Sequence, residues 1–349
     1  MLKYIILAIT LMLHTHRVTA QDPIPLPLPS KEDKVQVSNS PNEASTKQIM
    51  KKIPIKIGFN RNEDDLYIPL AGAICIFINE ETETSCRLNQ YNDSISALNA
   101  MLSGDIDIIM TNSLLGKYAI DGNKPFGNDN MQLKKIRFIG SFFDAKLSIL
   151  ASRDANIKTL DDLKNTTINI GKQYTNQRLI FDEILKAKQW NIADFQGSAE
   201  IDNSEAVKAI CDKTVDSIII VGEDRNKYMK EATRLCEVVI VSLTSNDIDL
   251  FTNDSRFLKS TIPGGMYIGA PQNIDTITTK AVLLTTSDIS SQQVELLMTT
   301  INKNLKKIKL LDESLTSLSI EKILSEGKIA QLHEGVVQFM NKNNLKEVN

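Results

Sequence analysis

The stretch from Thr167 to Phe195 contains the residues best suited to hold a ligand. It reads as a short apolar strand, Thr167 to Ile170, a polar loop that opens at Gly171, and then an amphipathic helix. The first N–H groups of a helix have no partner within it, and with the helix dipole they favour an anion. Arg178 stands at this entrance and could donate two hydrogen bonds to a carboxylate. The alternative is that Arg178 forms an ordinary ion pair and the loop is only a connection.

The composition is that of an ordinary globular protein. The 349 residues are enough for two domains, and 42% hydrophobic with 24% charged residues is typical of such chains. The charge balance of 40 basic against 43 acidic residues and the aromatic content of 5% weigh against a nucleic-acid partner. A small anionic ligand remains compatible with this balance, because one arginine can dominate a site.

The N-terminus predicts export. Lys3 is followed by an apolar run, Tyr4 to Leu13, and Val18-Thr19-Ala20 then precedes Gln21, which is the pattern of a secretory signal peptide over residues 1–20. The run is short for a spanning helix, and the alternative is a short uncleaved anchor. Residues 21–52 contain alternating prolines and then a polar run, so we expect a Pro-rich disordered linker there.

Neither catalytic nor metal chemistry is indicated. The chain has no GxSxG motif and no phosphate-binding loop. His333 is the only histidine beyond the leader, which weighs against His-based triads and multi-His metal centres, and there is no CxxC pair. We therefore expect a non-enzymatic protein with no cofactor and no metal.

The cysteines predict disulfides. Four of them follow the leader, at Cys75, Cys86, Cys211 and Cys236, and an even number in an oxidising compartment favours pairing. Local pairing would join Cys75 to Cys86 and Cys211 to Cys236. The sequence alone allows three connectivities.

Strands and helices alternate from Ile53 onwards, which predicts an α/β fold with a mostly parallel sheet. The expected strands are 55–58, 86–89, 106–110, 136–141, 147–152, 167–170, 217–221, 238–243 and 280–285. The expected helices are 69–79, 93–102, 203–211, 225–235, 294–308, 320–325 and 336–343, besides the one that follows Gly171. A second α/β unit over 150–245 suggests two lobes with a cleft between them.

Ligands of such sheets bind beyond the carboxyl ends of the strands. The loops 60–65, 90–94, 111–113 and 172–178 all follow or face such ends, and together they predict one site. The turn-rich segment 261–267 is expected to be a lid or a return loop.

Several short segments carry a family resemblance. They are Thr261–Tyr267, Lys186–Trp190 continuing to Phe195, Ala71–Cys75, Leu98–Ala100 with Ser103–Asp105, and Glu231–Thr233 with Cys236. In register from about Ile55 to Leu345, the chain resembles the TAXI (TRAP-associated extracytoplasmic immunogenic) solute receptors of tripartite ATP-independent periplasmic (TRAP) transporters.

The resemblance implies a two-lobed periplasmic-binding-protein type II fold with a ligand cleft between the lobes. It predicts residues 53–149 plus 279–349 as lobe 1 and residues 150–278 as lobe 2. Receptors of this kind are periplasmic, capture small organic solutes, often carboxylates or amino acids, and deliver them to membrane permease subunits. We also expect a monomer. The resemblance supports the local pairing of the four cysteines.

The resemblance places ten candidate ligand-binding residues in the cleft. Those that keep the family's residue type or a near equivalent are Tyr67, Ser94, Asn112, Ser113, Thr175, Gln177 and Arg178. Asn92 lies in a loop where the family has glycines, and Lys172 and Glu223 are new charges at cleft positions. Glu223 could pair with Arg178 or Lys172, or receive an ammonium group.

The cleft loops depart from the family pattern. Of the usual Gly-rich loop after the first strand only Gly58 remains, and bulky polar residues replace glycines between Lys172 and Arg178. Glycine would let backbone N–H groups approach a ligand closely, so the bulky residues should narrow the cleft or supply side-chain contacts instead.

These features predict an exported solute-binding receptor of a TRAP-type transporter. It would capture a small polar or anionic organic solute by hinge closure. The lost glycines motivate the alternative, a degenerate receptor-fold protein that acts in protein interaction without solute transport.

Overall fold

The computed structural model describes residues 54–61, 66–127, 131–253 and 256–346, all within one compact unit of the chain. The predicted signal peptide and linker lie outside these residues, as do 62–65 of the predicted cleft loop 60–65. Within the described ranges, none of the helices has the length and apolar character needed to cross a bilayer.

The described strands form one sheet in the order β2-β1-β3-β10-β4-β7-β5-β6, with β8 beside β4 and β9 beside β10. Their bounds are β1 (Ile55–Asn60), β2 (Cys86–Tyr91), β3 (Ile108–Asn112), β4 (Ile136–Ser152), β5 (Thr167–Asn169), β6 (Gly197–Ala199), β7 (Ser217–Gly222), β8 (Val238–Val241), β9 (Leu258–Ile262) and β10 (Ile274–Thr286). The prediction of a mostly parallel sheet needs correction. Pairing is parallel at both ends of the sheet but antiparallel around β4 and β10.

The centre of the sheet differs most from the sequence prediction. The two strands expected at 136–141 and 147–152 are one 17-residue strand, β4. β10 begins at Ile274, six residues before the predicted start at Lys280. Threonines hid this part of β10. They are buried there because their hydroxyls bond to β4, as when Thr276 donates to the Leu147 carbonyl at 2.6 Å.

The helices flank this sheet. They are α1 (Tyr67–Glu81), α2 (Ser94–Ser103), α3 (Ser113–Ile120), α4 (Asn176–Lys188), α5 (Asn203–Cys211), α6 (Lys227–Leu235), α7 (Ser245–Thr252), α8 (Ser291–Lys303), α9 (Leu305–Ile308), α10 (Ile320–Ser325) and α11 (Glu334–Lys342). The sequence did not predict α3 or α7. It placed the start of α6 two residues early, because Asn226 caps this helix and Arg225 has a left-handed φ of 62°. The segment 261–267 is β-strand in its first two residues and turn thereafter.

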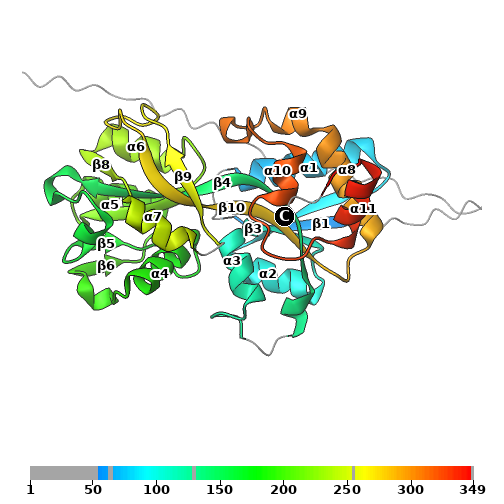
Figure 1. Cartoon of the computed structure of the whole chain (residues 1–349), viewed down its shortest axis with the longest axis horizontal. Helices are drawn as coiled ribbons and strands as arrows, with labels where there is room; N and C mark the ends of the chain where they lie inside the picture. The colour runs from blue at the N-terminus through cyan, green and yellow to red at the C-terminus, as the bar shows by residue number, and fades with distance from the viewer. Residues whose placement is uncertain (1–53, 62–65, 128–130, 254–255, 347–349) are drawn as a thin grey trace, which may run out of the picture. The chain divides into compact units, whose positions relative to one another are not determined.

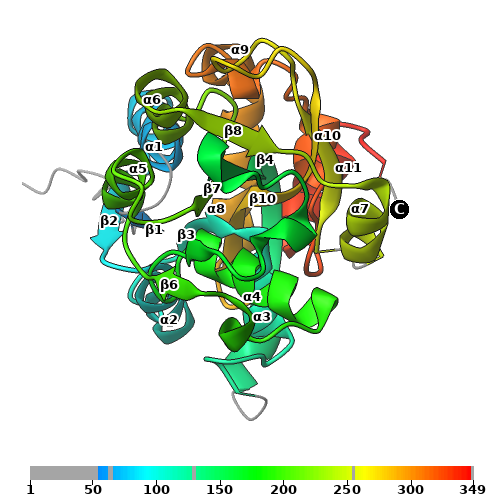
Figure 2. The same cartoon turned by 90° about the vertical axis from the view of Figure 1, so that its left-hand side faces the viewer.

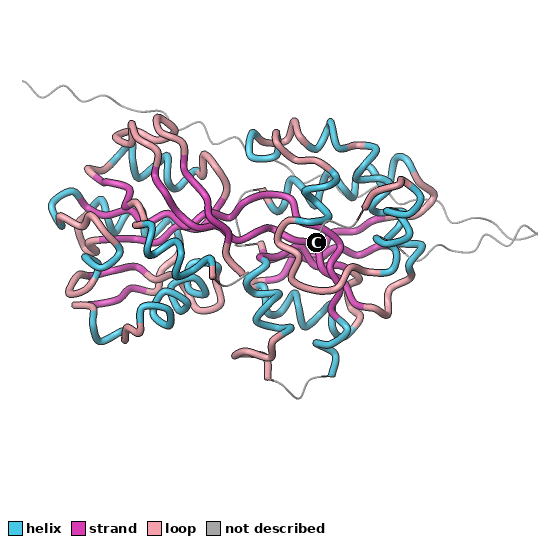
Figure 3. The backbone as a smooth tube through the Cα atoms, viewed as in Figure 1, coloured by secondary structure: helices cyan, strands magenta, loops and turns pink. Residues whose placement is uncertain are grey.

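The described unit has two lobes, which we define by their elements (Figure 1). The first lobe contains β1–β3, α1, α2 and α8–α11, and the second contains β5–β9 and α4–α7. β4 and β10 run through both lobes, as the unbroken magenta strands of Figure 3 show. The predicted lobe boundaries, 149/150 and 278/279, fall within these two strands and remain a prediction.

The second lobe shows how strand alternation builds two cores. Ile218 and Ile220 of β7 pack with α5 and α6, whereas Ile219 and Val221 face the core of α4 and α7. Figure 2 views this lobe end-on, with α5 and α6 on one side of the strands and α7 on the other. Helices therefore cover both faces of β7, which explains the apolar run that predicted this strand.

The structure contains both disulfides in the expected local pairing. One joins Cys75 in α1 to Cys86 in β2, and the other joins Cys211 at the end of α5 to Cys236 directly after α6, each across a Cα–Cα distance of 5.0 Å. The second disulfide fixes the far ends of two helices whose first residues border the cavity described below.

α3 connects the lobes through a buried group that we call the Glu183 clasp, formed by Tyr118, Glu183 and Arg256. The Tyr118 hydroxyl of α3 donates to the Glu183 carboxylate of α4, and an Arg256 Nη lies 2.8 Å from the other Glu183 oxygen. The Arg256 guanidinium also lies 5.8 Å from the centre of the Tyr118 ring. Leu114 and Leu115 of α3 pack in the second-lobe core as well.

The clasp predicts a large stability effect. Glu183→Ala removes the carboxylate from a site where the Glu183 and Arg256 side chains are only 8% and 10% exposed, so the free energy of unfolding should fall by about 3–5 kcal/mol. Glu200→Ala is the control, because Glu200 forms a half-exposed ion pair with Arg178 whose loss should change the value by less than about 1 kcal/mol. Urea unfolding of both variants measures the difference, and similar losses in the two would contradict the structural role of the clasp.

Candidate functional site

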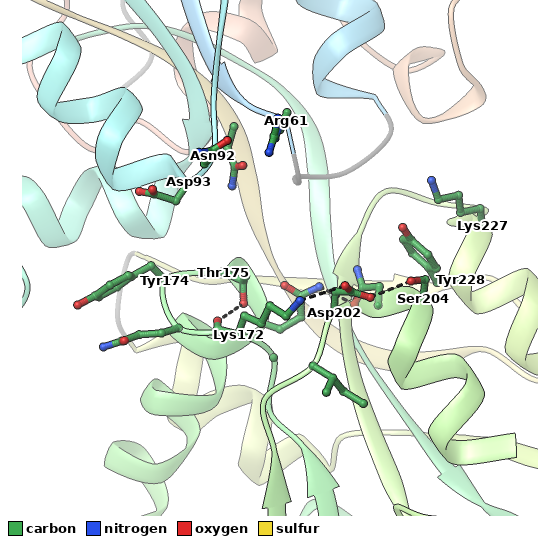
Figure 4. Close-up of a pocket in the computed structure, with 16 residues that line it drawn as sticks. Arg61, Asn92, Asp93, Lys172, Tyr174, Thr175, Asp202, Ser204, Lys227 and Tyr228 are labelled. Atoms are coloured by element: carbon green, nitrogen blue, oxygen red, sulfur yellow. Dashed lines mark hydrogen bonds and ion pairs between the residues drawn. The ribbon is translucent and has the colours of Figure 1, made fainter. Parts of the chain in front are cut away.

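A cavity of about 440 Å³ opens beyond the carboxyl ends of strands from both lobes (Figure 4). Its first-lobe lining follows β1 and β2, and its second-lobe lining follows β5, β6 and β7. The lining residues are Asn60, Arg61, Asn92, Asp93, Gly171, Lys172, Gln173, Tyr174, Thr175, Gln177, Ile201, Asp202, Asn203, Ser204, Lys227 and Tyr228. Most of these side chains are polar, so the cavity suits a hydrated or charged solute better than an apolar one.

The first turns of four helices adjoin this cavity. Asp93 caps α2, Thr175 caps α4, Asp202 caps α5 and Asn226 caps α6, each accepting a hydrogen bond from a backbone N–H of the first turn. Four positive helix ends favour an anionic solute group. The carboxylates of Asp93 and Asp202 already offset two of these ends.

The loop between β5 and α4 is held by a glycine. Gly171 has a φ of 78°, and a Cβ at this position would lie 2.7 Å from the Gln177 Cβ and 2.9 Å from the Thr175 hydroxyl. Only glycine therefore lets the loop pack against the start of α4. The Lys172 carbonyl accepts hydrogen bonds from the Thr175 N–H at 3.2 Å and the Thr175 hydroxyl at 2.7 Å, which closes a tight turn.

Two opposite charges, Lys172 and Asp202, pair in the second-lobe lining, which we call the floor of the cavity. Lys172 Nζ lies 3.1 Å from Asp202 Oδ2 and 3.8 Å from Glu205, and the bond to Asp202 raises the pKa of Lys172. Hydrogen bonds from the Glu205 N–H, the Ser204 hydroxyl and Lys172 lower the pKa of Asp202 to about 2. Lys172 is thus occupied by protein carboxylates in this structure.

Two further cations, Arg61 and Lys227, line the cavity. Arg61, on the first-lobe side in Figure 4, is exposed, and no ion pair joins it to any other residue in the described ranges. Lys227 is also exposed and lies 4.8 Å from the centre of the Tyr228 ring. Arg61 is therefore well placed to meet a solute anion.

The structure brings four of the ten predicted ligand-binding residues into the cavity lining, namely Asn92, Lys172, Thr175 and Gln177. Arg178 lies behind the lining, with its Nε 2.9 Å from Asp182 and an Nη 2.7 Å from Glu200. This arrangement matches the alternative of an ordinary ion pair. Burial lowers the pKa of Arg178. The two ion pairs outweigh this effect, so the pKa is raised.

The other five predicted residues support the lining from within the protein. Ser94 accepts a 3.1 Å hydrogen bond from Asn60, and the fully buried Tyr67 packs edge-on against Phe143. The start of α3 is fixed to β10, because Asn112 donates to the Thr279 hydroxyl at 2.7 Å and Ser113 accepts from the Lys280 N–H at 3.0 Å.

Glu223 is buried at the end of β7, where it accepts a 3.5 Å hydrogen bond from the Asn226 side chain. The partners expected for it are engaged elsewhere, Arg178 with Asp182 and Glu200, and Lys172 with Asp202 and Glu205. Its role as a ligand-binding residue stays a prediction.

Sequence reasoning missed several lining residues, above all Arg61, Tyr174, Asp202 and Tyr228. A signal existed for three of them. Arg61 and Tyr174 belong to loops that were placed at strand ends, and Asp202 directly precedes a predicted helix, as capping residues do. No local pattern marked Tyr228. In the described ranges, no group of three or more His, Cys, Asp or Glu residues is arranged to hold a metal ion.

Comparison with known proteins decides the family. The family model described as the NMT1-like family matches residues 63–342, which is most of the chain. The chain belongs to the NMT1-like family. The match includes both lobes and every element that borders the cavity except β1.

Solved structures similar to this NMT1-like protein are solute-binding proteins. The periplasmic sulfonate-binding protein SsuA from Methylobacillus flagellatus matches with a TM-score of 0.52 at 11% identity, over 84% of this chain and 96% of that chain. The periplasmic aliphatic sulphonate-binding protein SsuA from Escherichia coli matches with a TM-score of 0.47 at 14% identity, over 76% and 80%. At 11% identity the likeness to the Methylobacillus flagellatus protein concerns the fold alone, and it confirms the predicted two-lobed periplasmic-binding-protein type II fold.

The charge pair on the cavity floor predicts a pH effect in this NMT1-like protein. The pKa of Asp202 falls from 3.8 to about 2 on folding, so its stabilising contribution is present above pH 4 and is lost as the pH falls from about 4 to 2. Asp202→Asn keeps the helix cap but removes the charge, so the fall in unfolding free energy over this range should become shallower. The difference should stay below about 1 kcal/mol, because the side chain is half exposed.

Urea unfolding at pH 2, 3, 4 and 5 measures this difference. Asp212→Asn is the control, since Asp212 is an exposed residue at the opposite end of α5. Parallel pH profiles for Asp202→Asn and the unchanged protein would contradict the assignment.

Proposed function

We propose that this protein is an exported, non-enzymatic solute receptor that captures a small polar or anionic organic solute between its two lobes. The polar cavity at the strand ends of both lobes is the observation that carries the proposal. A solute bound there would touch both lobes at once, so its binding energy would favour the closed arrangement by population shift.

The solute's negative group would be held by Arg61. Lys172 is neutralised by Asp202 and Glu205, and Arg178 by Asp182 and Glu200. Arg61 instead lines the cavity from the first lobe, and its planar guanidinium suits the two oxygens of a carboxylate or the oxygens of a related anion. The adjoining helix starts would add to this attraction.

The receptor would act in the periplasm after removal of the predicted signal peptide, residues 1–20. Its proposed partners are the membrane subunits of a TRAP permease, on the strength of the sequence segments that resemble TAXI receptors. The solved relatives named above work, by their names, in sulfonate binding, and one is named as part of an ABC transporter. The TRAP-type permease and the monomeric state are therefore proposed from the sequence resemblance alone.

The second candidate function, protein interaction without transport, is favoured by the bulky residues Lys172, Gln173 and Tyr174 in the cavity lining. A thermal-shift screen against organic acids and amino acids separates the two. A ligand that binds the folded state raises the unfolding temperature, and at 100 times its Kd it contributes about 2.7 kcal/mol. No shift with any compound, together with a co-purifying protein, would favour the second function.

The role of Arg61 is tested by substitution. With the best acid from the screen, Arg61→Ala should weaken binding at least tenfold, or about 1.4 kcal/mol, because the charged hydrogen bonds to the solute are lost. Arg178→Ala should keep its affinity to within about threefold, because Arg178 contacts Asp182 and Glu200 instead. Arg87→Ala, at an exposed position in β2, is the control for loss of an arginine from the same lobe.

Isothermal titration calorimetry measures the three affinities. A loss in Arg178→Ala that equals or exceeds the loss in Arg61→Ala would overturn this assignment and restore Arg178 as the ligand-binding arginine. Unfolding temperatures of the three variants without solute show whether a loss of binding reflects a loss of folded protein.

A further inference from the structure

We infer that Tyr174 sets the maximum length of the solute that the cavity accepts, an inference that rests on the proposed function. Tyr174 lies in the tight turn that Lys172 and Thr175 close at the start of α4. In Figure 4 its side chain lies at one end of the cavity, on the side of Asp93, and extends away from Lys227 and Tyr228 at the other end. The ring therefore borders this end of the cavity.

The backbone of Tyr174 is unfavourable for a tyrosine. Its φ is 67°, in the left-handed region where glycine and asparagine are the usual residues. Gln189 shares such a φ of 55°, but it follows the last turn of α4, where left-handed residues commonly end a helix. Tyr174 precedes its helix, so this explanation does not apply, and a glycine would adopt the same turn without strain.

The contacts of the Tyr174 side chain do not explain its presence either. Among the described residues, its hydroxyl makes no hydrogen bond and its ring pairs with no other aromatic ring and no cation, although the side chain is half-buried. The Tyr228 ring, by contrast, carries Lys227 above it. A strained bulky residue without a structural partner, at the end of a ligand cavity, is best explained by contact with the ligand.

The lining offers separate surfaces to an anionic group and to an apolar tail. Arg61 attracts the anionic group, and apolar surface is provided by Tyr174, Ile201 and Tyr228. A hydrocarbon tail that extends from Arg61 towards Tyr174 would cover the ring face when short and would meet the ring when long. The solute class inferred here is a compact organic anion with a short apolar portion.

Straight-chain monocarboxylates from acetate to octanoate test this inference by isothermal titration calorimetry. The unchanged protein should bind the series up to a chain length beyond which affinity drops. Tyr174→Gly should bind octanoate at least fivefold more tightly than the unchanged protein does, with the affinity for acetate within about twofold. Tyr174→Phe keeps the ring and should keep the length limit.

Gln189→Gly is the matched control. Gln189, like Tyr174, has a left-handed backbone beside α4, but it is exposed and lies outside the cavity lining. This variant should leave the length limit unchanged, and both glycine variants should unfold at or above the temperature of the unchanged protein. A length limit that is the same in Tyr174→Gly would overturn the inference while the proposed function stands. Binding of no acid by any of the four proteins would also overturn the inference, whereas the proposed function fails only if the thermal-shift screen of organic acids and amino acids finds no ligand either.

Discussion

The fold depends on the antiparallel pairing of β4 and β10, because among the described strands these two run through both lobes of the sheet. Their pairing is irregular between Lys280 and Val282 and between Leu283 and Leu284, so the ladder already bends within the first lobe. Two buried lysines of this pair have carboxylate partners. Lys146 lies 2.6 Å from Asp224, and Lys280 lies 2.6 Å from Asp144. Any closure of the lobes must bend or twist these strands while keeping their charges paired.

The polarity of the cavity follows from the same sheet. Parallel strands on both sides of the β4–β10 pair end at the cavity, so the helices that follow begin there and direct their positive ends towards it. The protein offsets much of this charge with its own carboxylates, at Asp93 and at the Asp202–Lys172 pair. Arg61 and Lys227 add positive charge to the lining. A cavity that binds reversibly benefits from such a balance, because a strongly positive site would hold anions without discrimination.

Much of the fold was accessible from the sequence because local patterns agreed with it. α2 was predicted over 93–102, and it spans Ser94–Ser103 between the capping residues Asp93 and Gly104. α3 was missed because six of its eight residues are buried, and a helix that is apolar on most sides has no periodic pattern to detect. The first half of β10 was missed because its threonines are polar by composition and become core residues only through hydrogen bonds to β4.

The sequence by itself determined the α/β fold class, most of the strands and helices, and the loops that would border a ligand site, since these depend on periodicity, capping residues and the ends of strands. Only the tertiary structure decided which side chains enter the cavity. The sequence favoured Arg178 as the ligand-binding cation, but Glu200, directly after β6, and Asp182 of α4 pair with Arg178, whereas Arg61 lines the cavity from the other lobe. The availability of a charge depends on the partners that distant segments bring to it, and no local pattern records them.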